Sequence, residues 1–135
     1  MKTYVEFRSH KFPPYNGEEE QINPGLWGKR LAEYLMQRLG EKGIEIQGMI
    51  AEDWGWYVEV RNDGFPLGLC CGHQNGDDDQ FLCFTEPNAP VVKKLFKKID
   101  ATPQLIRLTA ALREILAADA EIREVVWREP QAVGR

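Results

Sequence analysis

The chain has 135 residues, 43% hydrophobic and 28% charged, with a formal net charge of −4. This length and balance are typical of one globular domain and exclude an intrinsically disordered chain. The acidic balance also argues against a general nucleic-acid-binding protein, which usually carries a basic excess.

No apolar run approaches the roughly 20 residues needed to cross a bilayer. Lys2 and Glu6 interrupt the stretch where a secretory signal would need apolar residues. We therefore expect a cytoplasmic protein without membrane association, whose three cysteines stay reduced.

The first predicted strand covers residues 2–9, because side chains alternate there with the period of a half-buried strand. Val5 and Phe7 would face the core. A polar loop follows, and Asn23-Pro24 predicts the start of a helix with an apolar side formed by Trp27, Leu31, Leu35 and Leu39.

A hairpin is predicted between Ile44 and Val60. A three-residue turn at 51–53 would pair Ile50 with Trp54 and Ile46 with Val58, and the apolar pattern favours it over a two-residue turn. Two further strands are expected at about 66–73 and 80–86, joined by a loop over 74–79.

Asn88-Ala89-Pro90 predicts a short helix with an apolar side formed by Val92, Leu95, Phe96 and Ile99. Thr102-Pro103 begins a longer helix with Leu112 inward, and the last strand is expected at 122–128. Residues 130–135 are expected to form a flexible tail.

The order β-α-β-β-β-β-α-α-β predicts an α+β fold. Consecutive strands joined by short turns favour a single, mostly antiparallel sheet, and the apolar helix sides require that the helices pack on one face of it. Residues 1–129 would form one domain.

The sheet face away from the helices is the first candidate site. Gly68, Cys70 and Gly72 share one side of their strand and would leave a shallow floor beside polar side chains. This face could hold a small polar ligand or a partner's side chains, or it could be a solvated surface with cross-strand ion pairs. The candidate ligand-binding residues are Glu6, Arg8, Tyr57, Glu59, Arg61 and Cys70.

The cysteines do not predict a metal site. If residue 70 lies opposite 83, the strand pleat places Cys70 and Cys83 on one side and Cys71 and His73 on the other. A tetrahedral metal needs ligands that converge, so we expect no metal and no cofactor. Cys70 and Cys83 could form a cross-strand disulfide under oxidation.

Two sets of charged residues each have a structural and a functional interpretation. Glu52 and Asp53, beside two tryptophans, could be an acid/base pair or ordinary turn residues. The lysines at 93, 94, 97 and 98 would form one basic side of the predicted helix. That side could meet a phosphate, an acidic partner or the acidic loop 77–79, or could simply be solvated.

Four aromatic and glycine-rich motifs carry a resemblance to known proteins. They are Gly-Leu-Trp-Gly at 25–28, Glu-Asp-Trp-Gly-Trp at 52–56, Phe-Pro-Leu at 65–67 and Phe-Leu-Cys-Phe at 81–84. Over about residues 22–128 the chain resembles small uncharacterised bacterial proteins. The resemblance implies a bacterial origin, and because the motifs look structural it carries over no functional residue.

The function expected from these patterns is that of a non-catalytic binding or protein-interaction domain. Its partner would be a protein or a small polar ligand, and not a nucleic acid. One alternative is a small hydrolase-type enzyme that uses Glu52, Asp53 or Glu59. Another is an acidic immunity-type or inhibitor-type protein that covers a basic partner. The sequence does not predict the oligomeric state.

Overall fold

The centre of the molecule is a six-stranded sheet with the strand order β2-β3-β4-β5-β1-β8, seen in a computed structural model that describes residues 1–73 and 76–130. Every neighbouring pair in this sheet is antiparallel. The strands are β1 (Tyr4–Arg8), β2 (Ile46–Glu52), β3 (Gly55–Val60), β4 (Leu67–His73), β5 (Gln80–Glu86) and β8 (Arg123–Arg128).

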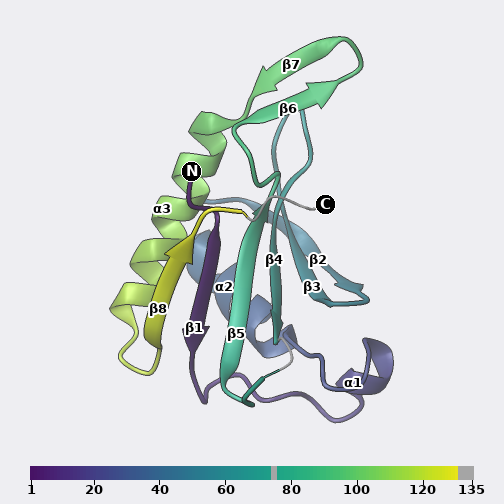
Figure 1. Ribbon diagram of the computed structural model, residues 1–135, viewed down its shortest axis with the longest axis vertical. Coiled ribbons are helices and arrows are strands. Elements are labelled where there is room, and N and C mark those ends of the chain that lie inside the picture. Colours follow the sequence, from purple (N-terminus) through teal and green to yellow (C-terminus); the bar gives the residue numbers. More distant parts are fainter. Residues whose placement is uncertain (74–75, 131–135) are drawn as a thin grey trace.

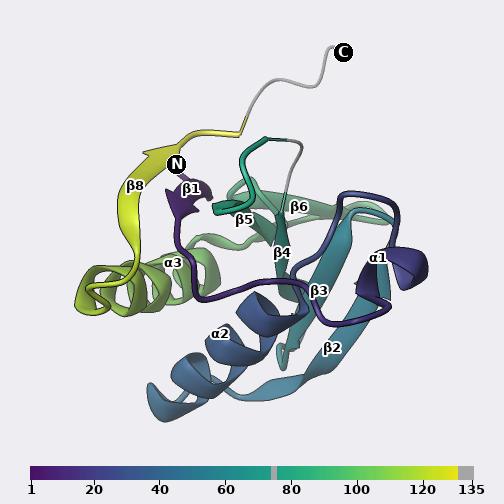
Figure 2. The same cartoon turned by 90° about the horizontal axis from the view of Figure 1, so that it is seen from below.

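The two long helices, α2 (Lys29–Glu41) and α3 (Thr102–Ala118), pack side by side on one face of the sheet (Figures 1 and 2). A short helix, α1 (Glu18–Gln21), lies in the connection before α2. The core forms where the helices meet the sheet, and Leu35 and Leu112 are at most 1% exposed there. The predicted α+β fold with its antiparallel sheet is therefore confirmed. None of the helices in the described parts of the chain has the length and apolar character that crossing a bilayer requires.

Strand β1 has the predicted alternation. Val5 and Phe7 are at most 1% exposed and belong to the core, whereas Glu6 and Arg8 are only half-buried on the other face.

The first long helix begins later than predicted, at Lys29 instead of after Asn23. Asn23 instead pairs with Leu26 in a tight turn. The α2 N-terminus receives no cap from its own N-cap residue, Gly28. The Glu18 carboxylate takes this role, because its Oε2 accepts the backbone N–H groups of Gly28 and Lys29, each at 2.8 Å. A residue ten positions upstream thus sets the start of the helix.

The β2–β3 register also differs from the prediction. Glu52 pairs with Gly55 across a two-residue turn, and Ile50 lies opposite Tyr57 and is 48% exposed. A bulge between Ile46 and Gly48 shifts the register, so the isoleucines of β2 do not share one face. The predicted three-residue turn is wrong because it assumed an unbroken alternation.

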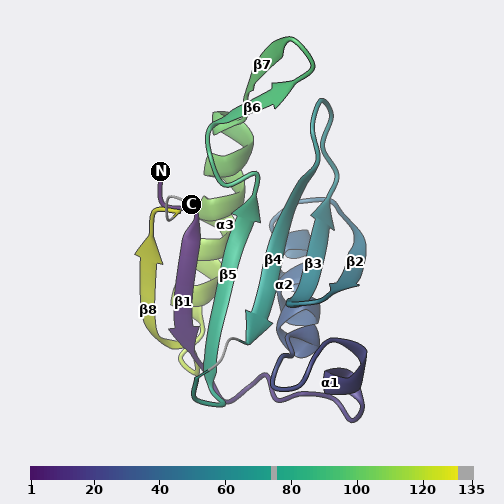
Figure 3. The same cartoon turned by 45° about the vertical axis from the view of Figure 1, so that its right-hand side comes forward.

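The helix predicted over 88–99 is a β-hairpin. Strands β6 (Val91–Lys94) and β7 (Lys97–Asp100) form a separate two-stranded sheet that projects from the body (Figures 1 and 3). Val92 pairs with Ile99 and both pack against the core at its base. The Ala101 N–H donates to the Pro90 carbonyl at 2.6 Å and closes this base.

Two predicted segments fall partly outside the described residues. Of the loop expected at 74–79, residues 76–79 are described and carry no helix or strand. Of the tail expected at 130–135, only residue 130 is described.

Candidate functional site

The open sheet face has the strand orientation that the sequence predicts. Tyr57 lies opposite Cys70 and Glu59 opposite Gly68, while Leu69 and Cys71 point toward the helices and join the core. The three small residues of β4 therefore do face away from α2 and α3.

Tyr57 covers the Gly68 end of the floor formed by these small residues. A Cβ atom added to Gly68 would lie 2.2 Å from Cζ of Tyr57, so the tyrosine ring lies directly over the glycine. Cys70 is fully buried. Burial raises the pKa of Tyr57 to about 12, with a further contribution from Cys70, so the phenol stays neutral. Burial, followed by the charge of Glu86, also raises the pKa of the Cys70 thiol well above its ordinary value, which makes it a poor nucleophile.

The predicted ligand residues do not form one contiguous set. Tyr57, Glu59 and Cys70 lie on the neighbouring strands β3 and β4, but Glu6 and Arg8 lie on β1, beyond β5. Arg8 is held by two carboxylates, with Nη1 2.9 Å from an oxygen of Asp77 and 2.8 Å from one of Asp79. Arg61, just past the end of β3, pairs with Glu45 at 2.9 Å. Ligand binding by this face stays a prediction.

The cysteine pairing differs by one residue from the expected one. Cys71 lies opposite Cys83, and Cys70 lies opposite Phe84, so Cys70 and Cys83 face different sides of the sheet. The predicted Cys70–Cys83 cross-strand pair is therefore wrong, and all three thiols are free. In residues 1–73 and 76–130, no group of three His, Cys, Asp or Glu side chains is placed to hold one metal ion.

The carboxylates considered for acid/base chemistry do not gather at a pocket. Glu52 and Asp53 are exposed at the β2–β3 turn. Together with Glu59, they line neither the pocket beside Trp27 nor the pocket beside Lys11 and Tyr34.

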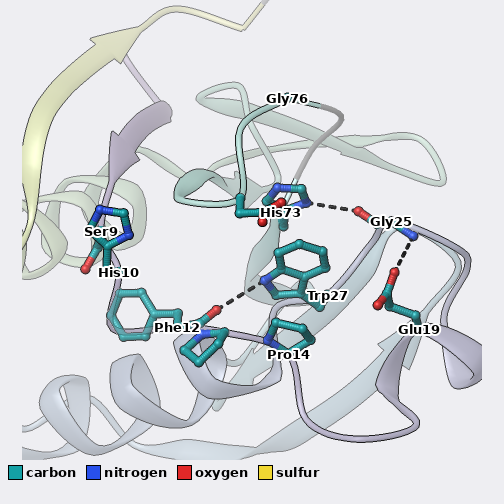
Figure 4. A pocket seen from close by; sticks show the side chains of 11 residues that line it. Ser9, His10, Phe12, Pro14, Glu19, Gly25, Trp27, His73 and Gly76 are labelled. Carbon is teal, nitrogen blue, oxygen red and sulfur yellow. Dashed lines mark hydrogen bonds between the residues drawn. The ribbon is translucent and has the colours of Figure 1, made fainter.

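A pocket of about 570 Å³ lies where β1 and β4 end, and we call it the Trp27 pocket (Figure 4). Its floor consists of three nearly buried rings, those of Phe12, Trp27 and His73. The exposed His10 and Asp78 also line it, and Glu19 from α1 lies on the other side of Trp27 from His10, where its carboxylate accepts the Gly25 N–H at 2.7 Å (Figure 4). Two carboxylates and no lysine or arginine thus line the pocket among the described residues.

The ring nitrogens of this floor all face backbone carbonyl oxygens of the protein. The indole N–H of Trp27 donates to the Phe12 carbonyl at 3.1 Å. The His73 ring stacks on Trp27 with a centroid distance of 3.8 Å, and its nitrogens lie 2.9 Å from the carbonyl oxygens of Gly25 and Asp77. A neutral imidazole donates to only one of these oxygens. The floor therefore offers few free hydrogen-bonding groups to a guest.

A second candidate is the segment Val91–Asp100, which we call the lysine hairpin. Its turn residues, Leu95 and Phe96, are exposed to 92% and 104% of their reference areas. Lys93 pairs with Lys98 and Lys94 with Lys97, so like charges lie directly opposite each other on both faces of the ribbon. Within the described parts of the chain, no carboxylate forms an ion pair with these four lysines.

The turn of the lysine hairpin departs from ordinary turn chemistry. Leu95 has a φ of 55°, a left-handed conformation that glycine, asparagine or aspartate usually occupies in two-residue hairpins. Two large apolar residues at such a turn, flanked by paired like charges, do not favour the folding of the isolated hairpin. Local costs of this kind are concentrated at functional sites.

Comparisons with protein-family models, with curated proteins and with solved structures found no match. Sequence reasoning identified the lysines but placed Leu95 and Phe96 on the apolar side of a helix. It also assigned Trp27 to a helix and missed its contact with His73. The only available signal for that contact was the Gly-Leu-Trp-Gly motif, which indicates a close approach of the backbone.

Proposed function

We propose that this chain is a non-catalytic protein-interaction domain and that the lysine hairpin is its main contact element. The observation that carries the proposal is the exposure of Leu95 and Phe96 at a projecting turn between two pairs of lysines. Buried aromatic anchors contribute most of the binding energy at protein interfaces. A Phe96 side chain that enters a partner's hollow would supply such an anchor.

The partner surface that fits this hairpin is acidic around an apolar hollow. Carboxylates on the partner would relieve the repulsion between opposed lysines while the apolar turn is buried. The hairpin has four lysines and one aspartate, whereas the whole chain carries −4. The rest of the chain is therefore acidic, and this balance differs from the basic excess usual in nucleic-acid-binding proteins, which favours a protein partner.

We place this interaction in the cytoplasm. The support is chemical: Cys71 and Cys83 face each other on neighbouring strands and yet are unpaired, as are the thiols of proteins in reducing compartments.

Site-specific photo-crosslinking in cells tests the proposal. The photoreactive residue p-benzoylphenylalanine replaces Phe96 in one protein and Ile106 in a matched control. Ile106 is also an exposed apolar residue, at 53%, but lies on α3. We expect a discrete covalent adduct from position 96 and not from position 106.

Two outcomes would contradict the proposal. One is the absence of any adduct at position 96 under conditions in which the protein is folded and abundant. The other is an equal pattern of adducts at both positions, because exposure alone would then explain the crosslinks.

A further inference from the structure

The lysine hairpin and the Trp27 pocket lie at opposite ends of the molecule. The hairpin projects beyond one end of the sheet, and α1 and the ends of β1 and β4, which bound the pocket, lie at the other (Figures 1 and 3). The hairpin of one molecule therefore cannot reach its own pocket. A contact between the two needs a second molecule.

The two ends have complementary charge. Among the described residues, the pocket is lined by Glu19 and Asp78 with no lysine or arginine. The hairpin turn lies between Lys94 and Lys97, with a second lysine pair directly behind them. Lysines that approach this pocket would meet carboxylates and replace mutual repulsion by attraction.

The two ends also have complementary polarity. On the pocket floor the Trp27 indole N–H already donates to a backbone carbonyl, and both His73 ring nitrogens face backbone carbonyls, so a polar guest would gain few hydrogen bonds there. An aromatic ring that packs on Trp27 and Phe12 loses no such bond and gains stacking contacts. The volume of about 570 Å³ lies within the range of roughly 300–1,000 Å³ that is usual for ligand pockets.

We propose that the lysine hairpin of one copy of this chain docks into the Trp27 pocket of a second copy, with Phe96 on the aromatic floor. This inference rests on the proposed function and names the partner of the same hairpin. The contact is heterologous, because two different surfaces meet. The resulting dimer still presents one free hairpin and one free pocket, so association continues head to tail into short chains or closes into a ring.

Complementation between two single-site variants tests this pairing. Phe96→Ser removes the anchor and leaves the pocket intact. Asp78→Lys reverses an exposed charge that lines the pocket and leaves the hairpin intact. Glu114→Lys, which reverses an exposed charge on α3, is the matched control. Sedimentation measures the mass of each protein alone, and circular dichroism confirms that each is folded.

We expect the parent and the control to form species of at least twice the 15.5 kDa chain mass as concentration rises. Salt raised from about 0.1 M to about 1 M should dissociate them, because the Debye length falls from about 10 Å to about 3 Å. Phe96→Ser and Asp78→Lys should each be monomeric alone. Their equimolar mixture should form a dimer and stop there, because only one hairpin and one pocket remain active.

A parent protein that stays monomeric at every concentration would overturn the inference, as would a mixture of the two variants that stays monomeric. The crosslinking experiment at position 96 separates this failure from failure of the proposed function. An adduct of twice the chain mass supports the self-association. An adduct with a different protein rejects self-association and leaves the proposed function standing, and no adduct rejects both.

Discussion

The carboxylate of Glu18 joins three separate parts of the chain, and its removal is the most informative test of the fold around the pocket. Glu18 is 3% exposed. Its Oε2 accepts the N–H groups of Gly28 and Lys29 and the indole N–H of Trp56, the last at 2.9 Å. Its Oε1 accepts the Tyr15 N–H at 3.0 Å. One side chain thus caps α2, anchors β3 and holds the loop before α1.

Glu18→Ala should lower the free energy of unfolding by about 3–5 kcal/mol. Loss of the acceptor leaves several donors unpaired, and each buried unpaired donor costs about 1–3 kcal/mol, reduced where water can enter. Glu18→Gln should cost less, about 1–3 kcal/mol, because the amide keeps one acceptor oxygen but turns an N–H₂ group toward another donor. Both values include the loss of the negative charge of Glu18, which stabilises the N-terminus of α2.

Urea unfolding followed by tryptophan fluorescence measures these changes. Glu20→Ala is the control, because Glu20 lies in the same short helix but is exposed, and its removal should change stability by less than about 0.5 kcal/mol. A Glu18→Ala protein within about 0.5 kcal/mol of the parent would refute the role given to this carboxylate.

The remaining predictions concern the core, the acid response and one close backbone approach. Leu112→Ala removes a side chain that is 1% exposed and should cost about 2–5 kcal/mol; an unchanged thermal melt would contradict its place between sheet and helix. Burial alone would raise the pKa of Asp119, but hydrogen bonds from Lys11 and Tyr34 lower it to about 2. Because an unfolded aspartate has a pKa of about 3.9, this stabilisation is complete above about pH 4 and is lost as pH falls toward 2. Asp119→Asn should therefore flatten the decline in stability over that range, and a decline as steep as the parent's would count against the cluster. In Gly28→Ala the new Cβ would lie 2.7 Å from the Cys71 carbonyl oxygen and should cost on the order of 2 kcal/mol, whereas Gly40→Ala on α2, with open space around it, should stabilise by about 0.5–1 kcal/mol. Equal melting temperatures for these two variants would show that the approach of Gly28 to β4 is not tight.

The faces of the sheet could be predicted from local alternation. Val5 and Phe7 on β1, and Trp56 and Val58 on β3, recur with period two, and all four are buried against the helices. Because burial of one face repeats the alternation along the whole strand, a small error in where the strand ends does not change which face is assigned to the core.

Register could not be predicted in the same way, because it depends on single residues. One bulge between Ile46 and Gly48 moved the isoleucines of β2, and one residue of difference in the β4–β5 loop brought Cys71 opposite Cys83. Neither change alters the residue types found in the strands, so the sequence pattern does not indicate it.

The lysine hairpin was mistaken for a helix because its apolar residues satisfy both periods. Val92, Leu95, Phe96 and Ile99 have helical spacing, yet Val92 and Ile99 also pair across a two-residue turn. The β-branched residues at both ends favour the hairpin, and helical spacing alone outweighed them in the prediction.

The Trp27 pocket could not be predicted from the sequence for a different reason. Its floor joins Phe12, Trp27 and His73, which come from three segments far apart in the chain. The start of α2 was misplaced for the same reason, since its cap is the distant Glu18.

In the proposed interaction, the apolar turn and the lysines of the hairpin act together on an acidic partner. The most direct measurement is the yield of the position-96 photo-crosslink with the native lysines and after Lys93→Glu combined with Lys98→Glu. These two residues lie opposite each other, so the double change replaces one like-charged pair by another. The repulsion within this pair is therefore similar in the parent and in the variant. We expect the yield of the adduct to fall on the order of tenfold, because attraction to the partner becomes repulsion. An unchanged yield of the same adduct would contradict the proposed interaction.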